Sequence, residues 1–145
     1  MTRVIGLDHG SRRIGVAVGD TATGMAFARP ALQRRDLVLD LDTISALVRD
    51  EEAELVVLGL PRNMDGSEGS QAAAARDFGE RLVAIGLRVE FVDERLTSWQ
   101  AAEQLADEGR RVRRRSGEVD SAAARLILQE YLDADLPPDV DQEAE

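Results

Sequence analysis

Cysteine and lysine are both absent from this chain of 145 residues, and the only histidine is His9. Without cysteine there can be no disulfide, thiolate nucleophile or sulfur-bound zinc, and one histidine cannot build a histidine-rich metal site. Without lysine there is no Walker A loop and no Schiff-base nucleophile. Aromatic residues make up 3% of the chain, too few for a base-stacking platform. Any metal ion must therefore be bound by oxygen atoms.

Long apolar runs are also absent, so nothing in the sequence has the length of a membrane-spanning helix. The chain begins with a strand-like segment, Arg3-Val4-Ile5, in place of the charged and apolar regions of a signal peptide. We therefore expect a soluble, cytoplasmic protein with no membrane partner.

Negative charge dominates the composition but is unevenly distributed. The net charge of −10 argues by itself against a polyanionic partner. Residues 133–145 contain six acidic residues and no basic one, which leaves −4 on the rest of the chain. Five arginines are concentrated just before the final predicted helix: Arg110, Arg111, Arg113, Arg114 and Arg115. This arginine loop is either a solvated charge run or a phosphate contact.

The apolar pattern predicts one domain over residues 1–132, followed by an acidic tail over 133–145 that we expect to be disordered. Three strands in the first 32 residues form a predicted antiparallel meander. Three strands followed by alternating helices and strands favour a mixed α/β sheet flanked by helices. The further elements predicted are strands at 55–60 and 88–92 and helices at about 37–48, 70–85, 97–107 and 119–132.

Acidic residues follow two of the predicted strands. Asp8 ends the first strand and precedes Gly10, so it is either a turn residue or a group placed where open α/β sheets bind ligands. Asp93 and Glu94 follow the fifth strand, where we expect a parallel neighbour of the first strand to end. Successive strand residues face opposite sides, so only one of these two can point inward. The other, with Arg95, would then be a supporting residue.

A third acid, Asp120, lies in the first turn of the last predicted helix. The helix dipole favours acids at such positions whatever their function. However, Asp120 shares the apolar stripe of Ala123 and Ile127, where an unpaired carboxylate would be costly. We therefore expect a cation beside it.

Three carboxylates from separate elements match oxygen-only coordination of Mg²⁺ or Mn²⁺. A pair of such ions can promote hydrolysis of a phosphodiester without a protein nucleophile. Arg12 and Arg13 follow Asp8 closely and, like the arginine loop, could bind phosphates beside the acids. His9 should face away from Asp8 as a packed residue.

Four segments in order and at matching spacing together resemble the YqgF (RuvX) family: Asp8–Ala17, Gly59–Gly66, Asp93–Thr97 and Val119–Ala123. Its members are described as Holliday junction resolvases and as nucleases that mature the 5′ end of precursor 16S rRNA. The resemblance reaches about Leu132 and implies a ribonuclease-H-like fold with Asp8, Glu94 and Asp120 as catalytic acids. It thus favours Glu94 over Asp93. Where family members often carry lysines, this chain has Ser116 and Glu118, and Arg113 to Arg115 are plausible substitutes.

The leading hypothesis is therefore metal-dependent hydrolysis of precursor rRNA or of a four-way DNA junction. Junction cleavage needs two symmetric cuts, so a stable two-fold homodimer would support it, whereas RNA trimming needs one site. One alternative is a noncatalytic protein that binds nucleic acid or a processing factor. Another is an actin-like ATP-binding protein, because Asp8 and Gly10 resemble its phosphate loop, but such proteins use two lobes and this chain has one.

Overall fold

A computed structural model describes residues 2–61, 69–93 and 116–143, and within this part it describes the side chains up to Ala134 except those of residues 116–120. Strands and helices follow one another in the order that the sequence predicts over these ranges. The strands are β1 (Arg3–His9), β2 (Arg13–Asp20), β3 (Met25–Gln33), β4 (Leu55–Leu60) and β5 (Val89–Asp93). The helices are α1 (Leu37–Glu51), α2 (Ser70–Ala84) and α4 (Ser116–Glu143). The helix predicted at 97–107 lies outside the described residues.

The five strands form one mixed sheet in the order β3-β2-β1-β4-β5. Strands β1, β2 and β3 pair antiparallel, which confirms the predicted meander. Strand β4 pairs parallel with β1, and β5 pairs parallel with β4. The expectation that the fifth strand neighbours the first was therefore wrong, because β4 lies between them. Its entirely buried sequence suits this central position.

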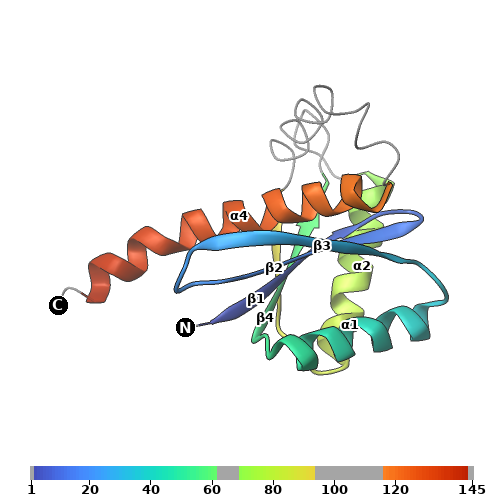
Figure 1. Cartoon of the computed structure of the whole chain (residues 1–145). Helices are drawn as coiled ribbons and strands as arrows, with labels where there is room; N and C mark the ends of the chain where they lie inside the picture. Colours follow the sequence, from blue (N-terminus) through green and yellow to red (C-terminus); the bar gives the residue numbers. More distant parts are fainter. Residues whose placement is uncertain (1, 62–68, 94–115, 144–145) are drawn as a thin grey trace.

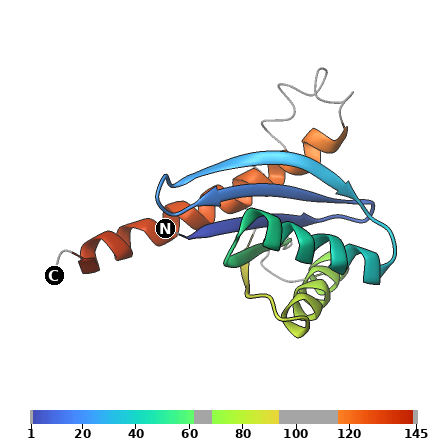
Figure 2. The ribbon, with the colours of Figure 1, turned by 60° about the horizontal axis from the view of Figure 1, so that its bottom comes forward.

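Helices cover both faces of the sheet (Figures 1 and 2). On one face, α1 and α2 bury a core that contains Leu7, Leu58 and Phe78. On the other, α4 packs Ala124 and Leu128 against alternate residues of the same strands. Two cores on opposite faces follow from the period-two alternation of strand side chains.

Helix α1 has well-defined ends that fix its position beside the sheet. The carboxylate of Asp36 accepts a hydrogen bond from the backbone N–H of Leu39 at 2.9 Å and caps the first turn. Glu52 takes a left-handed conformation with φ 56° just after the helix. Only residues 34–36 separate β3 from α1, and the N–H of Arg34 donates to the carbonyl oxygen of Arg12 at the end of the sheet.

Helix α4 is longer than the predicted helix at 119–132. It begins at Ser116 and continues through Pro137 and Pro138 to Glu143, so that its second half extends past the sheet (Figure 1). The disorder expected for residues 133–145 stays a prediction. Among the helices of the described ranges, none combines the length and the apolar character needed to cross a membrane.

Candidate functional site

Asp8 lies at the carboxyl end of β1, one residue before the strand ends, and its side chain is half-buried. By strand alternation it shares a face with Val4 and Gly6. Val4 belongs to the core that α4 covers. The carboxylate of Asp8 is therefore on the α4 face of the sheet, at the end where parallel neighbours also finish.

Helix α4 crosses β1 in close contact at Gly6. A Cβ atom at this position would lie 2.7 Å from Cβ of Leu128 and 3.1 Å from the carbonyl oxygen of Ala124. Farther along α4, Leu132 approaches Gly19, which pairs with Val4 near the start of β1. The helix therefore runs antiparallel to β1, with its N-terminal part toward Asp8.

This register brings the backbone of Asp120 level with Asp8. Asp120 precedes Ala124 by four residues, which is about 6 Å along a helix. Asp8 follows Gly6 by two residues, which is about 6.6 Å along a strand. The two acids thus occupy corresponding positions on facing elements, while the side chain of Asp120 lies outside the described part.

Asp93 is the last residue of β5 and pairs with Leu60. It alternates with Phe91, which packs in the core beneath α1 and α2. Asp93 is therefore on the opposite face of the sheet from Asp8. Its neighbours Glu94 and Arg95 lie outside the described residues.

The single histidine faces away from Asp8, as the sequence predicts. The ring of His9 stacks on Phe78 of α2, with 4.7 Å between the ring centroids. Burial lowers the pKa of His9, and the positive charge of Arg34 lowers it further. His9 is thus a neutral packed residue of the α2 side.

Arg12 is the last residue of the turn that follows β1, and Arg13 begins β2. Arg12 is exposed, whereas Arg13 is half-buried and pairs with Gln33 at the start of β2. Both lie within five residues of Asp8, so this end of the sheet joins an acidic group to guanidinium groups. The arginine loop at 110–115 lies outside the described residues.

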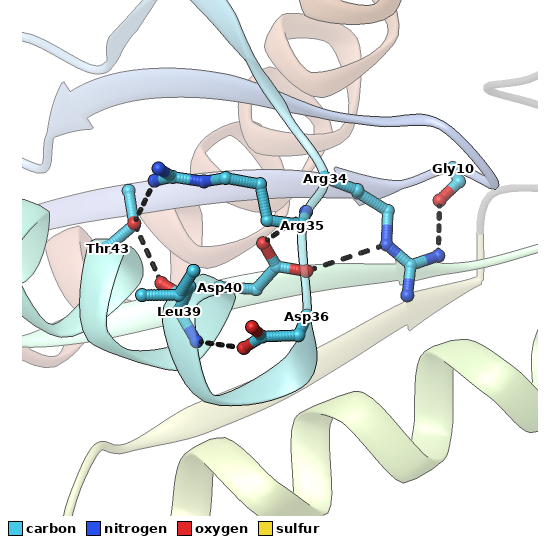
Figure 3. Close-up of polar contacts among 7 residues, drawn as sticks. All are labelled: Gly10, Arg34, Arg35, Asp36, Leu39, Asp40 and Thr43. Atoms are coloured by element: carbon cyan, nitrogen blue, oxygen red, sulfur yellow. Dashed lines mark hydrogen bonds and ion pairs between the residues drawn. The ribbon is translucent and has the colours of Figure 1, made fainter.

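The sequence reasoning missed an ion pair between Arg34 and the buried Asp40 that lies beside the same turn (Figure 3). Nε of Arg34 is 3.7 Å from Oδ2 of Asp40, whose side chain is 4% exposed. Nη1 of Arg34 donates to the carbonyl oxygen of Gly10 at 3.0 Å. A signal was present, because Asp40 precedes the buried Ile44 by one helical turn, an acid on an apolar stripe like Asp120.

The donor chemistry at this end of the sheet fits a hard divalent cation. Asp8 offers carboxylate oxygen, and His9, the only nitrogen ligand of its kind, is on the other face. Oxygen donors without sulfur or imidazole match Mg²⁺ or Mn²⁺. Within the described side chains no three metal-binding residues cluster, and of the three proposed acids only Asp8 has a described side chain.

Comparisons with known proteins agree on one family. Residues 2–134 match the model of the RuvX family, described as Holliday junction resolvase. A relative from Synechococcus elongatus, named "putative pre-16S rRNA nuclease", is 45% identical over 92% of this chain and 91% of its own. One from Moorella thermoacetica with the same name is 46% identical over 90% of this chain and 94% of its own.

Among solved structures, RuvC of T. thermophilus in complex with a Holliday junction substrate matches with a TM-score of 0.54 and 13% identity. The match covers 88% of this chain and 92% of that one, and it shows a common ribonuclease-H-like fold. The family match over nearly the whole chain, together with relatives at 45–46% identity, identifies the function class as nuclease. This chain therefore belongs to the RuvX family.

Proposed function

We propose that this chain hydrolyses phosphodiester bonds of a structured nucleic acid, with Asp8, Glu94 and Asp120 holding a pair of divalent cations, Mg²⁺ or Mn²⁺. The observation that carries the proposal is the register of α4 on β1, in which Gly6 contacts Ala124 and Asp8 is level with Asp120. Glu94 is favoured over its neighbour because Asp93 is on the opposite face from Asp8.

Each part of the site has a separate task. Asp8 supplies negative charge at a half-buried strand end, where it can hold a cation against the sheet. Arg12 and Arg13 neutralise and orient phosphates next to that charge by bidentate hydrogen bonds. The chemistry that two bound cations supply is activation of water and stabilisation of the leaving oxygen. The side chains themselves therefore need only hold the cations and bind and orient the substrate.

Precursor rRNA is the favoured substrate. The relatives that carry the rRNA name are 45–46% identical to this chain, whereas RuvC, which binds a junction, is 13% identical. Junction cleavage also needs two symmetric cuts, which a two-fold homodimer would supply. RNA trimming makes no such demand of the chain.

The test is a cleavage assay on a precursor rRNA fragment and a four-way DNA junction, each with Mg²⁺ and with Mn²⁺. Asp8→Asn should abolish cleavage while the circular dichroism spectrum is unchanged. The matched control is Asp42→Asn, an exposed acid on α1 that should cleave like wild type. Cleavage by Asp8→Asn at the wild-type rate would refute the assignment, and inactivity of wild type on both substrates would favour a noncatalytic binding protein.

A further inference from the structure

A tight turn connects Asp8 to the two arginines of the proposed site. Strand β1 ends at His9 and β2 begins at Arg13, so Gly10, Ser11 and Arg12 form the turn. The N–H of Gly10 donates to the carbonyl oxygen of Arg13 at 2.9 Å, and a Cβ atom at Gly10 would lie 2.8 Å from that oxygen. The position of Arg12 therefore depends on how this turn is held.

Arg34 holds the turn at two points. Its backbone N–H donates to the carbonyl oxygen of Arg12 at 2.9 Å. Its Nη1 donates to the carbonyl oxygen of Gly10 at 3.0 Å (Figure 3). A single residue from the β3–α1 segment thus binds both the first and the last residue of the turn.

Asp40 in turn holds Arg34. Oδ1 of Asp40 accepts from the backbone N–H of Arg35 at 2.9 Å, while Oδ2 faces Nε of Arg34 across 3.7 Å. Neither Oδ2 nor Nε has a hydrogen-bond partner within the described part of the chain, so the ion pair compensates the buried charge. Ion pairs that include a buried carboxylate often contribute little net stability, because desolvation of the carboxylate offsets the attraction. The pair is therefore better explained by the geometry it imposes.

We propose that Arg34 is a positioning residue, fixed by Asp40, that orients the 10–12 turn so that Arg12 and Arg13 bind phosphates beside Asp8. The inference rests on the proposed function for its substrate, a nucleic acid. The polar contacts of Arg34 itself are with two backbone carbonyls and with Asp40. Its effect on nucleic acid should consequently pass through the turn arginines.

The experiment measures the dissociation constant for the precursor rRNA fragment by fluorescence anisotropy in Ca²⁺, which makes the readout independent of cleavage. The test variant is Arg34→Met/Asp40→Asn, which removes both charges of the ion pair together. Asn retains an acceptor for the Arg35 N–H and Met retains the aliphatic stem, so the chain should fold, as checked by its melting temperature. We expect the dissociation constant to rise about tenfold through loss of oriented guanidinium contacts.

A double-mutant cycle separates positioning from a general structural effect. In an Arg12→Ala/Arg13→Ala background, the same Arg34→Met/Asp40→Asn change should raise the dissociation constant less than about twofold. The matched control is Arg35→Met, which removes the neighbouring guanidinium that donates to Thr43. This change should alter the dissociation constant by the same factor in both backgrounds, which means that Arg35 is not coupled to Arg12 and Arg13. Equal weakening in both backgrounds, or unchanged binding in the wild-type background, would overturn the proposal. Cleavage by Asp8→Asn is measured separately, so a failure of the proposed function can be distinguished from a failure of the role proposed for Arg34.

Discussion

The hydroxyl of Ser121 donates a hydrogen bond to the backbone carbonyl of Arg29, joining helix α4 to strand β3. Ser121 is 1% exposed, and Arg29 lies where the register of β3 on β2 shifts by one residue. Such an irregularity leaves a backbone group free of the regular ladder. The hydrogen bond from Ser121 attaches the turn of α4 that follows Asp120 to the sheet at this irregularity.

Ser121→Ala should therefore lower both stability and activity. Loss of one such hydrogen bond costs about 1 kcal/mol of unfolding free energy, measured by urea titration. Cleavage should fall more than this loss explains, because Asp120 immediately precedes the released residue. Ser70→Ala, an exposed serine at the start of α2, is the matched control. Wild-type stability in Ser121→Ala would show that the bond contributes nothing.

Gly6→Ala should displace α4 from β1. The added methyl would meet Leu128 at 2.7 Å and Ala124 at 3.1 Å, so the helix must shift. Overpacking of this kind costs about 1–3 kcal/mol. Because Asp8 and Asp120 depend on this contact for their register, cleavage should fall sharply at temperatures where the variant is still folded.

The control for Gly6→Ala is Gly86→Ala. Gly86 has φ 102° and open space around it, so alanine there strains the backbone without touching α4. It should lose stability but keep the activity of its folded fraction. If both variants lose activity only in proportion to their unfolded fraction, then activity does not depend on the register of α4 on β1.

Arg12→Ala should weaken nucleic-acid binding, and it should also make the affinity less dependent on salt concentration. Each phosphate contact that is lost reduces the slope of log affinity against log salt by about 1. Arg81→Ala, which removes an exposed arginine bonded to Asp77 on α2, should leave the slope unchanged. Binding isotherms at several salt concentrations provide the measurement. An unchanged slope in Arg12→Ala would remove this residue from the phosphate contacts.

Asp20 should make stability depend on acid pH. The N–H of Thr23 donates to its carboxylate at 2.8 Å and lowers the pKa of Asp20 from its ordinary value of 3.8. A carboxyl whose pKa is lower in the folded state contributes stability above the ordinary pKa and loses it as pH falls through the folded pKa. Wild type should therefore exceed Asp20→Asn in stability at neutral pH, and the difference should shrink below about pH 4. A difference that is constant with pH, in urea titrations, would contradict this.

Local sequence determined the elements and the chemistry available to them. Alternation predicted the three strands of the meander, and the apolar run at 55–60 predicted a strand buried on both faces. The same alternation predicted that His9 would turn from Asp8. The lack of cysteine and of further histidine restricted any metal site to oxygen. These properties depend on residue type and on period along the chain, and both can be read without knowing the neighbours in space.

Tertiary packing decided what these elements bring together. The insertion of β4 between β1 and β5, and the contact of Gly6 with α4, are relations between distant segments that no local period encodes. The pairing of Asp40 with Arg34 likewise required the β3–α1 segment to lie against the β1–β2 turn. The sequence by itself thus determined that oxygen atoms are the available metal ligands, while the packing of α4 across β1 decided which segments of the chain lie beside the end of β1.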